Sequence, residues 1–172
     1  INTMCYLMAV DSAIFMAEEF DTDRITELQT LRGCIADGIN RIFFHEGTLS
    51  YGNGVQGEDV FALALEIVPD TYKQALKEKI EQHYRVETDY HLDTGIVLTP
   101  ILIEHLTDKG YRDIAYGIMT AKTYPSYYSL MENDTTFSEH WSKKWPDYYI
   151  GDNNSKLVKG GGDLSHCHPM YG

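Results

Sequence analysis

Cysteine and basic residues are scarce in this chain of 172 residues. The three cysteines, Cys5, Cys34 and Cys167, are widely spaced and form no C-x-x-C pair, which excludes a disulfide framework and a zinc site of that pattern. Because Cys5 and Cys34 fall within helical patterns, we expect both to be small buried apolar residues. Lys and Arg together number 14 against 26 Asp and Glu, a formal net charge of −12, which argues against nucleic acid and anionic membranes as partners.

Long apolar runs are missing as well. No run approaches the roughly 20 residues of a membrane-spanning helix, so we expect no membrane span. The opening stretch INTMCYLMAV has neither an initial Met nor the basic region of a signal peptide. We therefore expect the first residue to be a cut point inside a longer chain, which leaves the compartment unknown. The apolar fraction of 43% is that of a globular protein, and we expect a single domain over residues 1–172.

What the sequence does contain is helical periodicity. Apolar residues recur at three- and four-residue steps in residues 2–19, 25–42, 57–67, 70–80, 96–106 and 111–119. The clearest stripe is Ile25, Leu28, Leu31, Ile35, Ile39 and Ile42. Asp21 or Thr22 is a plausible N-cap for that helix, and Gly110 stands where a C-cap glycine belongs. The segment FALALEIV is almost wholly apolar, so its helix should be buried on most sides.

The linkers between these helices alternate between tight and long. Residues 45–59 and 87–95 are long polar loops, whereas the linker at Gly110 is short. No segment shows sustained alternation of period two, so a fold built on strands is not expected. Repeated helix pairs with long loops on one face are typical of an α/α toroid or solenoid, and we predict an all-α fold of this kind.

Aromatic residues gather after residue 122, where helical periodicity weakens. Within TTFSEHW, Glu139 lies between Phe137 and Trp141. A carboxyl group in an aromatic environment holds its proton more tightly, which suits proton transfer, and aromatic faces beside acids are typical of sugar sites. The other interpretation is a glutamate in the first turn of a helix capped by a neighbouring Thr or Ser. The local sequence leaves both interpretations open.

Two further polar stretches are candidates for ligand contact. His166 and His168 in SHCHPMYG can bind a polar ligand or hold a turn, and because a third ligand is not fixed nearby we predict no metal site. In DYHLDTG, Asp93 and Thr94 can either cap the next helix or face a ligand. The glycine-rich loop YGNGVQGED lacks the G-K-[ST] of a phosphate-binding loop, and the nucleophile pattern G-x-S-x-G is absent from the sequence.

Four sequence blocks together carry a resemblance. They are TGIVLTP at 94–100, TYPS at 123–126, TTFSEHW at 135–141 and SHCHPMYG at 165–172, in this order. The chain resembles the bacterial α-L-rhamnosidases of glycoside hydrolase family 78, from about residue 40 to its end and more loosely before that. The resemblance implies that the helix pairs belong to an (α/α)6 barrel and that no cofactor is needed. It also favours a secreted or periplasmic setting.

The resemblance further implies an inverting mechanism with two carboxyl groups, one acting as general acid and the other activating a water. Glu139 is then the expected general base, and Trp141 would line the sugar pocket. His168 would contact the rhamnose of a rhamnose-containing carbohydrate substrate. Asp93 and Tyr127 are weaker candidates for the pocket wall.

This sequence also departs from the family pattern. Many members have Trp-Glu-Arg-Trp where Ser138 to Trp141 stand, and many have Trp at the position of Tyr127. An upstream acidic block with Arg-Asp-Glu, which carries the general acid, is not present. We therefore expect roughly the second half of a barrel, inactive by itself and completed by the remainder of its own catalytic domain. The alternative is a non-catalytic helical-repeat module that binds glycan or protein.

Overall fold

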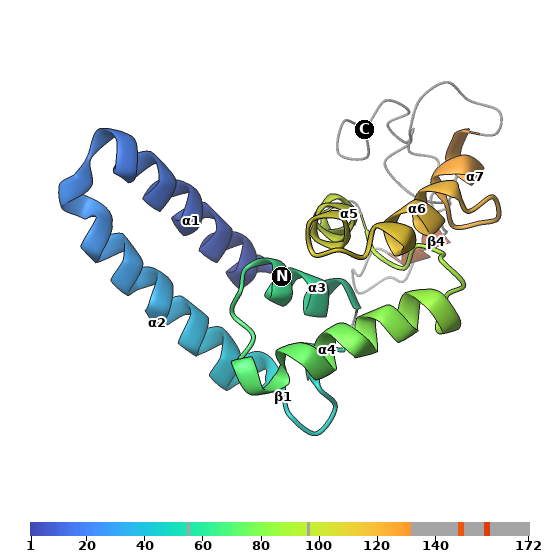
Figure 1. Ribbon diagram of the computed structural model, residues 1–172, viewed down its shortest axis with the longest axis horizontal. Coiled ribbons are helices and arrows are strands. Elements are labelled where there is room, and N and C mark those ends of the chain that lie inside the picture. Colours follow the sequence, from blue (N-terminus) through green and yellow to red (C-terminus); the bar gives the residue numbers. More distant parts are fainter. Residues whose placement is uncertain (55, 96, 132–147, 150–156, 159–172) are drawn as a thin grey trace. The chain divides into compact units, whose positions relative to one another are not determined.

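The computed structural model describes residues 1–54, 56–95, 97–131, 148–149 and 157–158 (Figure 1). The chain forms two compact units, Ile1–Ile80 and Glu81–Gly172, which are considered one at a time below. The described part is mainly helical, as the periodicity predicts. That residues 1–172 form a single domain stays a prediction.

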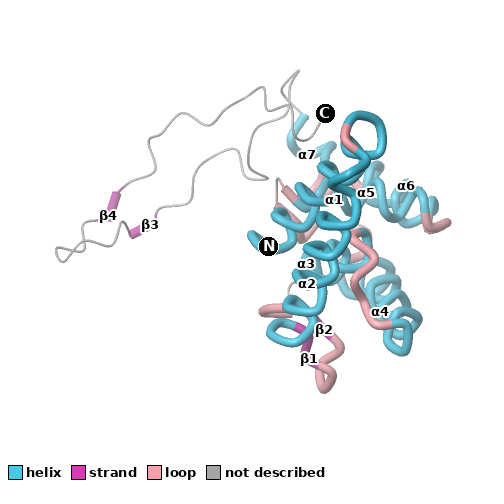
Figure 2. Tube along the Cα trace, turned by 90° about the vertical axis from the view of Figure 1, so that its left-hand side faces the viewer, coloured by secondary structure: helices cyan, strands magenta, loops and turns pink. Residues whose placement is uncertain are grey.

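The first unit begins with a helical hairpin. Helix α1 (Asn2–Phe20) leads through a 3-10 turn, η1 (Thr22–Arg24), into α2 (Ile25–Phe43), and the two helices run side by side in opposite directions (Figures 1 and 2). One stripe of α1 is buried, consisting of Met4, Leu7, Val10 and Ala17. These residues recur at steps of three, three and seven, which keeps them on one helix face.

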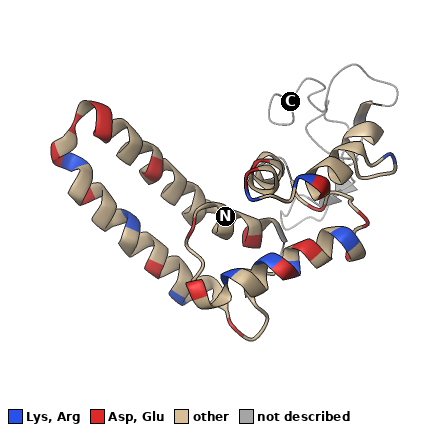
Figure 3. Cartoon of the chain, viewed as in Figure 1, with Lys and Arg blue, Asp and Glu red and all other residues tan. Residues whose placement is uncertain are grey.

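A short hairpin and two further helices complete this unit. Strands β1 (Phe44–His45) and β2 (Ser50–Tyr51) pair antiparallel, and α3 (Gln56–Ala64) and α4 (Asp70–Gln82) follow. The expected burial of the FALALEIV segment is confirmed, since the core includes Val60, Phe61, Ala62, Leu63, Leu65, Ile67 and Val68. Helix α4 carries both Lys and acidic residues, which are coloured blue and red in Figure 3.

The second unit continues α4 as a π-helical turn, η2 (His83–Glu87). Helices α5 (Leu98–Asp108) and α6 (Arg112–Thr120) form a pair, and α7 (Tyr127–Met131) packs on α6. Strands β3 (Tyr148–Tyr149) and β4 (Leu157–Val158) pair antiparallel. Gly110 has a φ of +94° and the Tyr111 N–H donates to the Leu106 carbonyl at 2.8 Å, so the predicted glycine cap of α5 is confirmed.

Several local expectations are wrong. Cys34 is exposed and Cys5 is only half-buried. Of the α2 stripe only Leu28 and Ile39 are buried, whereas Ile42 is 59% exposed. Neither η1 nor α2 has a side-chain N-cap, so the expected capping by Asp21 or Thr22 is not formed.

Large apolar side chains remain exposed on α1. They include Phe15 at 69% and Phe20 at 87% exposure, with Met8 and Met16 on the same helix. Exposed apolar surface of this kind favours association with other apolar surfaces in water. Across the part of the chain that the structure describes, none of the helices combines the length and apolarity needed to span a bilayer.

We expect Phe15→Ser with Phe20→Ser to reduce self-association of the 172-residue chain, because the double change removes the two most exposed aromatic side chains of α1. Sedimentation at a series of protein concentrations measures the effect. Glu18→Ser, at an exposed position of the same helix, is the matched control and should leave association unchanged. Equal association of the double variant and the original chain would contradict this expectation.

Candidate functional site

The loop of residues 88–95 is held by the helical end that precedes it. The Thr88 N–H donates to the His83 carbonyl at 3.0 Å, and the Tyr90 N–H donates to the Tyr84 carbonyl at 2.7 Å. Asp89 and Tyr90 have φ values of +48° and +61°, in the left-handed region that residues other than glycine seldom adopt. Backbone conformations of this kind persist only where the surrounding contacts enforce them.

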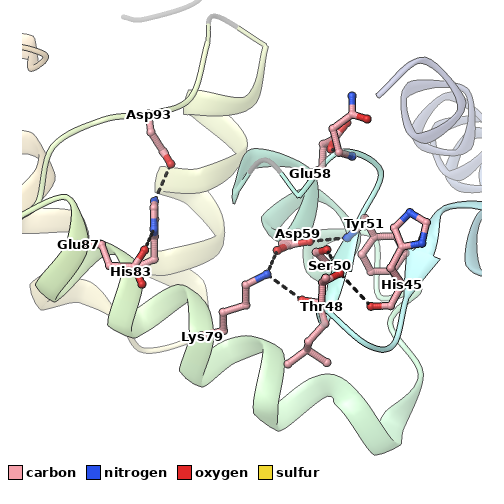
Figure 4. A network of polar contacts seen from close by, with 12 residues as sticks. His45, Thr48, Ser50, Tyr51, Glu58, Asp59, Lys79, His83, Glu87 and Asp93 are labelled. Carbon is pink, nitrogen blue, oxygen red and sulfur yellow. Dashed lines mark hydrogen bonds and ion pairs between the residues drawn. The ribbon is translucent and has the colours of Figure 1, made fainter.

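Asp93 accepts hydrogen bonds from two side chains of that helical end. Nε2 of His83 lies 2.6 Å from Oδ2, as Figure 4 shows. The Tyr84 hydroxyl donates to Oδ1 at 2.7 Å. Tyr84 is buried, and burial, followed by the charge of Asp93, raises its pKa well above the usual value near 10, so it remains a donor. Asp93 is thereby fixed in one orientation.

Helix α5 has no side-chain cap, so the interpretation of Asp93 as its N-cap is wrong. The first turn is instead closed by the Leu98 N–H, which donates to the Gly95 carbonyl at 3.1 Å. The Thr94 hydroxyl lies 2.8 Å from that of Thr99, and both side chains are buried. Asp93 is therefore free of a capping role and faces His83 and Tyr84.

The imidazole of His83 lies between two carboxylates. Its Nδ1 is 2.7 Å from Oε2 of Glu87, one helical turn away, and its Nε2 contacts Asp93. A neutral imidazole donates through one nitrogen only, whereas an imidazolium donates through both. Both contacts are therefore hydrogen bonds only when the ring carries its second proton.

The loop of residues 88–95 is joined to the TYPS segment that precedes α7. The Leu92 N–H donates to the Pro125 carbonyl at 3.3 Å, and Nε2 of His91 is 2.6 Å from the Thr123 hydroxyl. The fold thus brings the loop that contains Asp93 beside the segment that leads to Tyr127.

Tyr127 lies at the start of α7 and is 7% exposed, and burial raises its pKa to about 12. This helix is capped reciprocally, because the Ser129 N–H donates to the Ser126 hydroxyl and the Ser126 N–H to that of Ser129, at 3.0 and 3.1 Å. Tyr127 is therefore an uncharged, buried residue on a fixed turn. The remaining predicted site residues, Glu139, Trp141, His166 and His168, lie outside the described residues.

The first unit contains a second polar cluster, which periodicity did not indicate. Asp59 is fully buried and accepts from the Tyr51 N–H at 2.7 Å and from Nζ of Lys79 at 3.0 Å (Figure 4). Lys79 also donates to the Leu49 carbonyl at 2.9 Å, and the Tyr51 hydroxyl donates to Asn40 at 2.6 Å. These contacts fix the β1–β2 hairpin to α3 and α4 within this unit.

A cavity of about 300 Å³ lies beside that hairpin. Its lining includes His45, Asn53 and Glu58, together with apolar residues of α1 and α2. The Asn53 N–H donates to Oε2 of Glu58 at 3.0 Å, which closes the glycine-rich loop on α3. Within residues 1–54, 56–95 and 97–131, no group of three His, Cys, Asp or Glu side chains is placed to hold a metal ion.

The comparisons with known proteins decide the family. The model of the bacterial α-L-rhamnosidase 6-hairpin glycosidase domain matches residues 1–172. The chain belongs to this family. The expectation of an all-α fold that forms part of an (α/α)6 barrel is thereby confirmed, and so is the resemblance carried by the four sequence blocks.

Relatives within the α-L-rhamnosidase family are much longer than this chain. The α-L-rhamnosidase of Streptomyces avermitilis is 34% identical over 93 residues, which cover 54% of this chain and 9% of that protein. The α-L-rhamnosidase of Formosa agariphila is 30% identical over 115 residues, which cover 66% of this chain and 12% of that protein. The matched segments therefore cover about a tenth of the length of these curated relatives.

Solved structures of α-L-rhamnosidases share the fold. The enzyme from Dictyoglumus thermophilum superposes with a TM-score of 0.79 at 28% identity, over 98% of this chain and 18% of its own. The Streptomyces avermitilis enzyme, solved in complex with L-rhamnose, superposes with a TM-score of 0.77 at 24% identity, over 98% of this chain and 16% of its own.

We expect Gly117→Ala to lower the free energy of unfolding by about 1–3 kcal/mol, because a Cβ there would overlap the ring of Tyr90 in the loop before Asp93. Helix propensity by itself favours Ala by about 1 kcal/mol. Gly33→Ala is the matched control, since nothing lies within 4 Å of a Cβ at that position, and it should stabilise α2. Urea unfolding measures both variants, and a stabilised Gly117→Ala variant would exclude the close contact with Tyr90.

Burial raises the pKa of Asp59 above its usual value near 3.8, against the opposing hydrogen bonds from Tyr51 and Lys79. The folded state therefore binds the Asp59 proton more tightly than the unfolded state, and ionised Asp59 costs stability. The quantity to follow is the free energy of unfolding of the original protein minus that of Asp59→Asn. We expect this difference to rise as the pH falls through the folded-state pKa of Asp59 toward about 3.8, and to stay constant at lower pH. Urea unfolding across this pH range measures it, and a difference that falls on acidification would show that the hydrogen bonds outweigh burial.

Proposed function

We propose that the chain is part of the catalytic domain of a glycoside hydrolase that removes terminal α-L-rhamnose from glycans or glycosides. The observation that carries this proposal is the family match over residues 1–172, supported by relatives that are named α-L-rhamnosidases. A structural neighbour holds L-rhamnose, which supports the same sugar for this chain. The net charge of −12 is compatible with an uncharged sugar substrate.

We propose an inverting mechanism in which Glu139 acts as the general base. Its carboxylate takes a proton from a water as that water attacks the anomeric carbon from the side opposite the departing oxygen. A carboxylic acid on the other side of the sugar protonates the leaving oxygen, and the two groups of such a pair are typically about 6.5–9.5 Å apart. The sequence offers no counterpart of the family's acidic block, so we place the general acid outside these 172 residues.

Four further residues are proposed to bind the sugar. Trp141 would stack on the apolar face of the rhamnose, and His168 would hydrogen-bond a hydroxyl. Asp93 and Tyr127 would form part of the wall, which is supported by the hydrogen bonds between the Asp93 loop and the segment leading to Tyr127.

We expect Glu139→Gln in the full-length protein to lower kcat on an aryl α-L-rhamnoside by a factor of about 10²–10⁴ or more, because an amide cannot accept the proton of the water. L-rhamnose should still bind, since the amide keeps the shape of the side chain. Glu104→Gln, at an exposed position of α5, is the control and should retain the original rate.

A Glu139→Gln variant with normal turnover would remove Glu139 from the mechanism. Rhamnose binding without any hydrolysis by the unmodified full-length protein would instead favour the non-catalytic glycan-binding module.

A further inference from the structure

We propose that His83 and Glu87 are positioning residues that hold the Asp93 carboxylate as a fixed acceptor for a hydroxyl of the bound sugar. This inference rests on the proposed function, because it assigns a role within the same sugar site. The residues come from the π-helical turn and the loop of residues 88–95, both in the second unit.

The Asp93 carboxylate has acceptor capacity to spare. Each of its oxygens accepts one hydrogen bond, Oδ1 from Tyr84 and Oδ2 from His83. An ionised carboxylate offers about four lone-pair sites, so about two remain once the contacts with the described residues are counted. The Asp93 side chain is 30% exposed, against 13% for His83, so Asp93 is the more accessible of the two partners. Sugar hydroxyls are the donors that such a fixed acceptor suits.

The His83 ring is itself fixed from two further directions. Nδ1 lies 2.7 Å from Glu87, and the ring meets the face of Tyr84 edge-on, with the centroids 5.1 Å apart and an interplanar angle of 81°. Glu87 therefore orients the ring, and the ring orients Asp93. An acceptor held in this way loses little side-chain entropy when a ligand binds.

The backbone around the cluster has the features of a functional site. His83 and Glu87 bound a π-helical turn, which in proteins is rare and often lies at functional sites. The loop that follows carries the positive φ angles of Asp89 and Tyr90. A carboxylate needed only to hold this loop would not require a second carboxylate behind the imidazole.

The test uses the full-length protein and 4-nitrophenyl α-L-rhamnoside. Asp93→Asn and His83→Leu are each expected to raise KM about tenfold with kcat within about twofold, which is the signature of a binding contact made equally in the ground and transition states. His83→Gln keeps one donor and should raise KM less than His83→Leu. The KM of the double variant, Asp93→Asn with His83→Leu, should not exceed the higher KM of the two single variants, because both changes remove the same interaction.

Glu78→Gln is the control, since it changes an exposed carboxylate of α4 with a local partner, Gln74, and should leave KM unchanged. An unchanged KM in folded His83→Leu, a loss confined to kcat, or additive effects in the double variant would each overturn the proposal. If His83→Leu does not fold, as thermal unfolding will show, His83→Gln carries the test with the same criteria.

Absence of hydrolysis by the unmodified protein would count against the proposed function and not against the positioning role. In that case the positioning role is tested by calorimetry, which measures the binding of L-rhamnose to the unmodified protein and to His83→Gln. Weaker binding by the variant would support the positioning role, and equal affinity, or no binding by either protein, would overturn it.

Discussion

Burial of one apolar stripe per helix is the constraint on which the rest of this structure depends. Helices of this length are not stable alone in water, and each gains stability by packing its apolar stripe against a neighbour. In the first unit α1 and α2 satisfy part of this requirement with each other, and the apolar helix α3 is buried almost completely. Phe15 and Phe20 show where it is not satisfied within the described residues.

The paired helices bury their apolar faces, so the polar candidate residues lie in the loops between them. A small number of polar contacts hold these loops in place. The Asp59–Lys79 pair fixes the hairpin of the first unit, and His83 with Tyr84 fixes Asp93 in the second. In both places a carboxylate accepts two donors, so a connection between helices gains a defined position. A rigid acceptor on a helical scaffold is suited to recognising one hydroxyl pattern.

Periodicity was sufficient to predict helices α1 to α6, because their stripes repeat at three- and four-residue steps over two turns or more, but it did not predict the short α7. It failed where tertiary contacts decide, as at Ile42 and Cys34, whose exposure depends on what covers them. Asp93 was identified as a candidate in the polar stretch DYHLDTG. Its contacts with His83 and Tyr84, however, depend on the loop conformation. The i,i+4 spacing of His83 and Glu87 was the available signal. Asp59 had none, since it ends the polar stretch 45–59, which predicts an exposed loop and not a buried carboxylate.

We propose above that this chain is part of an inverting α-L-rhamnosidase. The most direct measurement is proton NMR of the sugar first released from an aryl α-L-rhamnoside by the full-length protein, recorded before mutarotation. Inversion by a water activated at Glu139 predicts that β-L-rhamnose appears first and the α anomer only later. Initial release of α-L-rhamnose would contradict the account, because it requires a covalent intermediate and a different role for the carboxylate.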